Sequence, residues 1–332
     1  MRNEWMCKTL WFGLFRALAL ALLLSACGEN GYGQAGGKAF SMTGEISAAV
    51  LDEISGIQAG PGRDWYVHND EDKAEIYVID LQGNLRATVG FGSPGDPKLQ
   101  DPEGLAAVPG ADGPVLVLAD IGDNLQQRES IRLLMLPIPA PDVAGVYPTR
   151  VELLHSIVLH YPDGPRDCES IAYDTASGQI LFMSKRDKPP RLYGINAERA
   201  MREDEITLEF LGEVPGFRPP TPMDLLREPE RGEWISQPTG MDISADGRSA
   251  VVITYRSLYL FSRDGAESWA QAFRKKPLEF PGPPGSYEEA VGFIPDQDSV
   301  IVTTEKLPAP IYRLDLNWES AKHPAHASAT DP

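Results

Sequence analysis

A short phrase of the sequence recurs five times, and this repeat constrains the fold more than any other feature. In each copy a polar residue is followed by Gly, Ser or Ala, and then by aliphatic and other strand-forming residues. The five copies are ISGIQAG from Ile54, PEGLAAV from Pro102, CESIAYD from Cys168, PTGMDIS from Pro238 and EEAVGFI from Glu288. A phrase that recurs at intervals of tens of residues is typical of proteins built from repeated structural units.

Three further β-rich runs accompany most copies of the phrase. The second runs are DWYVHND, VLVLADIGDN, ILFMSKRD, AVVITYRS and VIVTTEK, and a third run follows each of them. Fourth runs are LRATVGF, VELLHSIVLHY, ITLEFLGEV and AFRKKPLEF. Three to four strands per unit predict the blades of an all-β propeller. A β-sandwich is disfavoured, because the quartet of strands repeats together with its own phrase.

The number of copies predicts five blades, with six as the alternative count. From Ser55 to Glu289 the equivalent positions are 48, 66, 70 and 50 residues apart, and the long intervals hold Pro-rich loops such as 215–234 rather than another copy. The fifth unit has no outer strand after Asn317. We expect the segment AFSMTGEISA, residues 39–48, to supply it and to close a propeller over residues 39–318, followed by a disordered tail over 319–332.

The first 26 residues have the pattern of a cleaved leader. Arg2, Lys8 and Arg16 precede an apolar core that is too short for a membrane span, which predicts a signal peptide. LSAC, ending at Cys27, resembles a bacterial lipoprotein cleavage box. The resemblance implies that Cys27 carries lipid (palmitate) and that residues 27–38 form a flexible tether. It also implies anchoring in the cell envelope, with the outer membrane favoured; whether the protein faces the periplasm or the cell surface is not decided. A plain secretory signal is the alternative.

The net charge argues against some classes of partner, and the number of cysteines argues against an intramolecular disulfide. The formal charge of −18 includes +2 from the leader (three basic residues against Glu4), so the mature chain carries about −20. Such a charge argues against nucleic acid and anionic lipid as partners. Cys168 is the one cysteine left after cleavage and lipidation of Cys27, so no intramolecular disulfide is expected. We expect a monomer.

The repeat also predicts where polar side chains meet. In a blade the first strand begins, and the antiparallel second strand ends, at the same mouth of the central channel. The first strands begin with Ser55, Glu103, Glu169, Thr239 and Glu289. The second strands end with Asn69 and Asp70; Asp120, Asp123 and Asn124; Lys185 and Arg186; Tyr255 and Arg256; and Glu305 and Lys306.

Two interpretations of the acidic residues at this mouth stay open. Carboxylates around one axis repel each other unless a cation lies between them, and oxygen ligands suit Ca²⁺. The predicted metal ligands are Glu103, Glu169, Asp120, Asp123 and Asn124. Alternatively, each Glu or Thr binds backbone groups of the neighbouring blade and locks the ring.

The basic residues at the mouth are equally open to two interpretations. Lys185, Arg186, Arg256 and Lys306 predict a small anionic ligand group, with Asn69, Asp70, Glu289 and Glu305 as further ligand-binding residues. Alternatively, the cations pair with Glu169, Glu289 and Asp187. Two other candidates are weaker: we expect His68 to be a packed strand residue, and Cys168 a buried thiol rather than a nucleophile.

Several phrases together resemble a known group of proteins. WYVHND, DPEGLA, LADIGDN, YPDGPRDCESI, MSKRD and EEAVGF are similar to those of a largely uncharacterised family of secreted bacterial β-propellers. The phrases also resemble, more loosely, esterase-like phytase propellers and calcium-dependent lactonase propellers. The lactonase resemblance implies that Glu103, Glu169, Asp123 and Asn124 hold a metal, although the chain differs in blade number and lacks a catalytic His dyad.

Two functions of different classes follow. The first is a lipid-anchored propeller that binds a ligand or a protein partner at its polar mouth. The second is a Ca²⁺-dependent hydrolase of a phosphoester or a lactone, with Glu103 and Glu169 as the candidate catalytic carboxyls.

Overall fold

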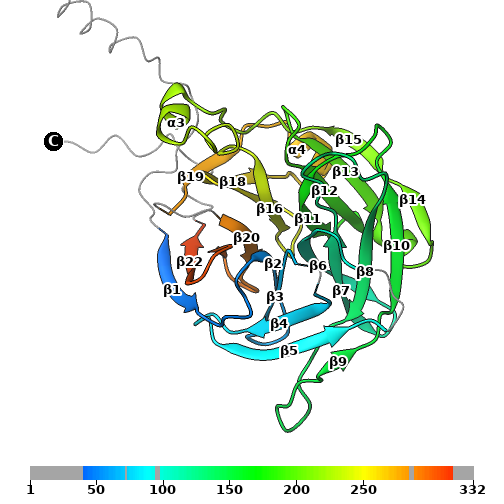
Figure 1. The fold of residues 1–332 in the computed structure, drawn as a ribbon. Coiled ribbons are helices and arrows are strands. Elements are labelled where there is room, and N and C mark those ends of the chain that lie inside the picture. Colours follow the sequence, from blue (N-terminus) through cyan, green and yellow to red (C-terminus); the bar gives the residue numbers. More distant parts are fainter. Residues whose placement is uncertain (1–39, 72, 94–97, 284–287, 317–332) are drawn as a thin grey trace, which may run out of the picture. The chain divides into compact units, whose positions relative to one another are not determined.

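The recurring phrase forms the innermost strand of a blade in every copy. The computed structural model describes residues 40–71, 73–93, 98–283 and 288–316. Its strands form five sheets arranged in a ring, with the inner strands β2 (Ile54–Ala59), β6 (Pro102–Gly110), β11 (Cys168–Asp174), β16 (Pro238–Ile243) and β20 (Glu288–Phe293) around the centre (Figure 1). The prediction of a five-bladed propeller is confirmed.

Each blade is completed by three antiparallel strands outside the inner one. Blade 1 adds β3 (Trp65–Asn69), β4 (Glu75–Ile79) and β5 (Leu85–Phe91). Blade 2 adds β7 (Gly113–Asp120), β8 (Ile131–Pro137) and β10 (His155–His160). Blade 3 adds β12 (Gln179–Ser184), β13 (Arg191–Asn196) and β15 (Glu209–Glu213). Blade 4 adds β17 (Ser249–Thr254), β18 (Ser257–Ser262) and β19 (Leu278–Pro281).

Blade 5 is completed by a strand from the other end of the propeller. Behind β20 come β21 (Ser299–Thr304) and β22 (Ala309–Asp315), and β1 (Ser41–Ile46) pairs antiparallel with β22. The pairing joins Ser41 to Arg313 and Ile46 to Ala309. This is the predicted closing strand, and it gives the fifth blade the same four strands as the others.

Two of the predicted fourth strands are divided between blades, and a third is shorter than predicted. In VELLHSIVLHY, β9 (Arg150–Val151) adds parallel to the outer edge of blade 1, whereas β10 belongs to blade 2. In ITLEFLGEV, β14 (Glu205–Thr207) adds parallel to blade 2, whereas β15 belongs to blade 3. In AFRKKPLEF only the end is strand, because the short helix α4 (Trp269–Ala272) precedes it. The other helices of the described residues are α2 (Ala197–Ala200) and α3 (Pro222–Arg227).

The apolar core lies between the blades. The buried apolar side chains of the described residues form five clusters, one for each pair of neighbouring blades. Both faces of a blade are therefore apolar, which explains why strands such as VLVLA and VVIT read as continuous apolar runs. Since burial of apolar area drives folding, each blade is stabilised chiefly by its two neighbours.

Every inner strand carries a β-bulge at its second residue. The register between the first and second strands shifts at Ile54/Gly56, Pro102/Gly104, Cys168/Ser170, Pro238/Gly240 and Glu288/Ala290. The residue skipped by each shift is the polar residue of the recurring phrase: Ser55, Glu103, Glu169, Thr239 or Glu289. A bulge leaves its extra residue unpaired and redirects its side chain, so the repeat encodes one redirected polar residue per blade.

The small residue after each bulge permits close packing of neighbouring inner strands. A Cβ atom on Gly104 would lie 2.5 Å from Ile171 Cγ2 of blade 3, and one on Gly56 would lie 3.0 Å from the Cα atom of Gly104. We expect Gly104→Ala to lower the free energy of unfolding by about 1–3 kcal/mol through overpacking. Gly265→Ala is the control, because a Cβ atom there meets nothing within 4 Å. Equal denaturation midpoints for the two variants would show that the strands can separate without cost.

Candidate functional site

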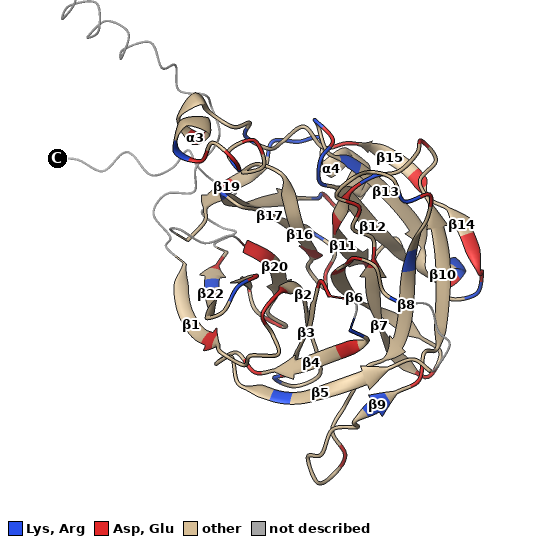
Figure 2. Ribbon diagram, in the orientation of Figure 1, with Lys and Arg blue, Asp and Glu red and all other residues tan. Residues whose placement is uncertain are grey.

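The mouth of the channel is a network of polar side chains centred on Lys185. The Lys185 ammonium forms an ion pair with Glu169 and donates to the Tyr255 hydroxyl over 3.2 Å. Tyr255 in turn donates to Glu289 over 2.8 Å. Figure 2 shows acidic residues on the inner strands near the centre of the ring. Blades 3, 4 and 5 are thus joined through one buried cation.

The Lys185 ammonium lies near glutamates of three blades, including two of the predicted metal ligands, Glu103 and Glu169. Its surroundings are acidic: although burial lowers the pKa of Lys185, Glu169, Glu289 and Glu103 raise it above its ordinary value. Burial raises the pKa of Glu169 to about 7 and raises that of Glu289 well above its ordinary range. The repulsion between the glutamates is relieved by an internal ammonium group and by retained protons.

Glu103 belongs to a carboxyl pair on the other side of the channel. Ser55 of blade 1 donates to Glu103 Oε2 over 2.5 Å, and Glu103 also shares a hydrogen bond with Asp101. Burial, together with the nearby Glu169 and Asp101, raises the pKa of Glu103 well above its ordinary range. A hydrogen bond between two carboxyl groups needs one proton, and the raised pKa of Glu103 favours Glu103 as its donor.

The phrase DIGDN packs against this carboxyl pair. A Cβ atom on Gly122 would lie 2.4 Å from Asp101 Cγ and 2.8 Å from Glu103 Oε1, so only glycine fits beside the pair. The Gly122 carbonyl accepts a hydrogen bond from Arg128 Nη1 over 2.7 Å. The turn therefore places backbone, rather than an acidic side chain, next to Glu103.

The other predicted metal ligands already have partners. Asp120 is fully buried and accepts from Arg128 over 3.0 Å and Arg132 over 2.6 Å. Asp123 Oδ2 accepts from the Arg128 amide over 2.8 Å, and the exposed Asn124 accepts from Arg186. No group of three His, Cys, Asp or Glu side chains within the described residues is arranged to hold a metal ion. The predicted ligands therefore do not form a coordination sphere, and these residues do not fit a bound Ca²⁺.

Two of the remaining basic residues at the mouth are also paired. Arg186 Nε lies 2.6 Å from Asp167 Oδ2, and its guanidinium lies over the ring of Trp234. Arg256 lies 2.5 Å from Asp224 of α3 and donates to the Arg218 and Pro219 carbonyls. Lys306 is exposed. With Lys185 also engaged, the structure agrees with the alternative in which the cations stabilise the fold, although two of the partners are Asp167 and Asp224 rather than Asp187 or Glu289.

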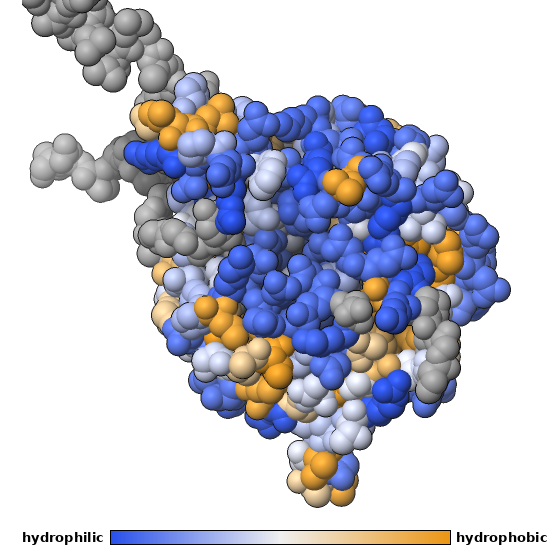
Figure 3. All heavy atoms as spheres, viewed as in Figure 1, coloured by the Kyte–Doolittle hydropathy of each residue, from blue (hydrophilic) through white to orange (hydrophobic). Residues whose placement is uncertain are grey.

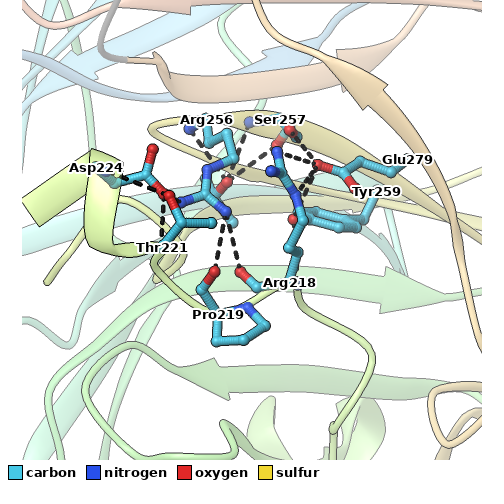
Figure 4. A network of polar contacts seen from close by, with 9 residues as sticks. Arg218, Pro219, Thr221, Asp224, Arg256, Ser257, Tyr259 and Glu279 are labelled. Carbon is cyan, nitrogen blue, oxygen red and sulfur yellow. Dashed lines mark hydrogen bonds and ion pairs between the residues drawn. The ribbon is translucent and has the colours of Figure 1, made fainter. Parts of the chain in front are cut away.

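The Arg256 contacts fix the Pro-rich loop beside blade 4. Its helix α3 exposes Met223, Leu225 and Leu226, which form an apolar patch in Figure 3. Thr221 and Asp224 form a capping box at the start of this helix. Figure 4 shows Arg256 reaching Asp224, and Arg218 reaching Glu279, which lies in β19. Arg256 is therefore a residue that holds the loop in place.

A second group of carboxyls lies at the edge of the mouth, and within the described residues only Asp101 has a nearby basic residue, Arg128. Burial raises the pKa of Asp70 to about 7, and Glu53, Glu305 and Asp101 add to the shift. These four residues come from blades 5, 1 and 2, and among the described residues none of them forms a salt bridge. The neighbouring Asn69 donates to Val50 O over 2.9 Å, while its buried Oδ1 has no hydrogen-bond partner in the described part of the chain.

His68 and Cys168 are both buried. Burial lowers the pKa of His68 to about 4, and its Nδ1 lies 2.8 Å from the Asn69 carbonyl. Burial raises the pKa of Cys168 to about 12, and its thiol donates to the Met183 carbonyl over 3.2 Å. A neutral thiol of this kind is a poor nucleophile.

Sequence reasoning missed Glu53, Asp101 and Asp167. All three stand two residues before the polar residue of the recurring phrase, as Gln237 does in blade 4. This position lies just before the inner strand, and its carbonyl accepts a backbone hydrogen bond from the end of the second strand: Asp70 N to Glu53 O, Gly122 N to Asp101 O and Lys185 N to Asp167 O. Aligning the copies two residues further upstream would have found it.

Comparison with known proteins adds little to these observations. A structure of a luciferin-regenerating enzyme is similar to this chain with a TM-score of 0.39 and 12% sequence identity, covering 84% of this chain and 96% of the other. No protein family model and no curated protein matches the sequence. Cys27, the leader, the tether and the tail lie outside the described residues. Within those residues, none of the helices has the length and apolarity needed to cross a membrane.

The acidic group at the edge of the mouth predicts a pH-dependent stability. Because Asp70 has a pKa of about 7 when folded but an ordinary value near 3.8 when unfolded, the folded state binds more protons between these pH values. The free energy of unfolding should therefore fall as pH rises from 4 to 7. We expect Asp70→Asn to remove part of this slope and to stabilise the protein by about 1 kcal/mol or more at pH 8.

Urea denaturation at pH 4 to 8 measures this effect. Asp112→Asn, in an exposed turn, is the matched control and should keep the slope of the unchanged protein. Parallel pH profiles for Asp70→Asn and the unchanged protein would mean that Asp70 titrates at its ordinary pKa.

Proposed function

We propose that this protein is a lipid-anchored, extracytoplasmic β-propeller that binds a cationic group of a ligand or partner protein at its channel mouth. One observation carries the proposal: Asp70, Glu53, Glu305 and Asp101 converge from three blades without a salt bridge among the described residues. Burial is the main cause of the raised pKa of Asp70, and the neighbouring carboxyls, which repel its negative charge, raise it further. A bound cation would relieve this repulsion, and perturbed groups of this kind are concentrated at functional sites.

The geometry favours a cation over the anionic group that the basic residues had suggested. Lys185, Arg186 and Arg256 are committed to Glu169, Asp167 and Asp224, so they have little charge left to offer a phosphate or carboxylate. The buried Asn69 Oδ1, next to Asp70 in the sequence, has no hydrogen-bond partner in the described part of the chain.

A hydrolase of a phosphoester or lactone is the second candidate, and the Glu103–Asp101 pair is the observation in its favour. A buried carboxyl that keeps its proton can act as a general acid. The channel space beside Glu103, Glu169 and Glu289 measures only about 10 Å³, room for about one water molecule. A substrate would have to approach from the mouth, so we prefer binding. Turnover that is lost in Glu103→Gln would favour the hydrolase.

Cation binding can be measured directly on the purified full chain. We expect spermidine, an organic cation, to bind at pH 7.5 by isothermal titration calorimetry with one molecule per chain. Asp70→Asn should weaken the binding at least tenfold, since one carboxylate and its charge are removed, whereas Asp112→Asn should leave it unchanged. Failure of spermidine to bind, or equal affinity in Asp70→Asn, contradicts the proposal.

The lipid anchor has its own test. We expect cells that produce the protein to incorporate a labelled palmitate into it and to retain it in the outer-membrane fraction. Cys27→Ser should abolish the label and either leave the leader uncleaved or release the protein, because one lipidated residue provides the anchor. Cys168→Ser is the control, since its thiol is buried. A palmitate label that persists in Cys27→Ser would exclude Cys27 as the modified residue.

A further inference from the structure

The channel opens widely at the end opposite the mouth. A cavity of about 1040 Å³ lies there, at the C-terminal ends of the inner strands, with walls that include Gln58, Tyr173, Asp242 and Phe293. The bulged residues of the mouth lie at the N-terminal ends of the same strands. The cavity is therefore separate from the carboxyl group around Asp70, and its volume is at the upper end of the range of small-molecule sites.

One half-buried carboxylate is presented in this cavity. Asp242 Oδ1 accepts from the Ile243 amide over 2.8 Å, and Oδ2 accepts from the Phe293 amide of blade 5 over 2.7 Å. Each carboxylate oxygen can accept a second hydrogen bond. Burial raises the pKa of Asp242 to about 7, opposed by these two amide groups. The carboxylate is thus fixed in position, and within the described parts of the chain it forms no salt bridge.

Apolar side chains accompany Asp242. The partly buried side chains of Phe293 and Tyr173 line the cavity, whereas Ile243 and Ile294 border it but are themselves buried in the clusters between blades. A carboxylate beside aliphatic and aromatic groups matches a ligand with a charged end and an apolar body. A purely hydrophilic ion would leave the apolar wall in contact with water.

The charges around the cavity determine the sign of such a ligand. Of its lining residues, Arg263 forms a buried salt bridge with Asp174 over 2.7 Å, and Asp264 lies 3.5 Å from Lys275. When the two paired residues are set aside, the charged lining residues are four carboxylates and one arginine: Asp242, Asp246, Asp296, Asp298 and Arg248. A surplus of carboxylates repels anions and attracts cations.

We propose that this cavity binds an organic cation, an ammonium group on an apolar body, with Asp242 accepting hydrogen bonds from the ammonium. The apolar body packs against Phe293 and its neighbours. This site is independent of the mouth, because it uses other residues at the opposite ends of the inner strands. The protein thereby has a small-molecule site in addition to the surface that we assign to a cationic group at the mouth.

A pair of probes with opposite charge tests the proposal on the full chain. We expect 3-phenylpropylamine to bind in isothermal titration calorimetry, and 3-phenylpropanoate, which has the same apolar body, to bind at least tenfold more weakly. Asp242→Asn should weaken amine binding at least tenfold. Asp112→Asn, on an exposed turn, should bind the amine as the unchanged protein does.

A second variant tests the proposal even if Asp242→Asn does not fold. Asp296 and Asp298 are exposed, and Asp296 has a positive φ of 59°, a conformation that asparagine tolerates, so Asp296→Asn/Asp298→Asn should fold. This double variant should weaken amine binding two- to fivefold at low salt, and its melting temperature should remain within a few degrees. Equal binding of both probes, binding of neither, or full amine affinity in a folded Asp242→Asn overturns the proposal.

Discussion

The ring of inner strands depends on the Lys185 ammonium. Three glutamates face one axis because the same bulge recurs in every blade, and three negative charges there would force the blades apart. Lys185 lies among them, paired with Glu169 and bonded to Tyr255, and burial raises the pKa values of Glu103 and Glu289 well above their ordinary range. A buried ion pair of this type is costly to break, because the remaining charge has no partner. Its benefit is a fixed register between blades 3, 4 and 5.

The two ends of the channel therefore have different properties. At the mouth, polar side chains fill the axis and leave only a space of about 10 Å³. At the other end the inner strands surround a cavity of about 1040 Å³, which is lined by Asp242 and by apolar residues. The difference follows from the sequence of each inner strand, which begins with a redirected polar residue and ends with side chains in regular alternation.

The repeat was sufficient to predict the blades, the closing strand and the end of the channel at which polar residues gather. These features follow from periodicity and from antiparallel pairing, which are properties of the backbone. The partners of the side chains were not predictable in the same way. Lys185 lies near glutamates of three blades, and Asp120 binds both Arg128 and Arg132. Both arrangements depend on how separate segments pack in the folded protein. The strands β9 and β14 were missed because two or three residues show no periodicity.

The pairing of β1 with β22 has a consequence for how the chain folds. Thr43 of β1 donates to the Ile311 carbonyl, 268 residues later, so the first strand has no partner until the last one has been synthesised. Contacts between such distant segments slow folding, because a long loop must close before they form. Until then blade 5 has an open edge, which other chains can pair with. For this protein the interval between the emergence of β1 and its capture by β22 is the period of greatest exposure to aggregation.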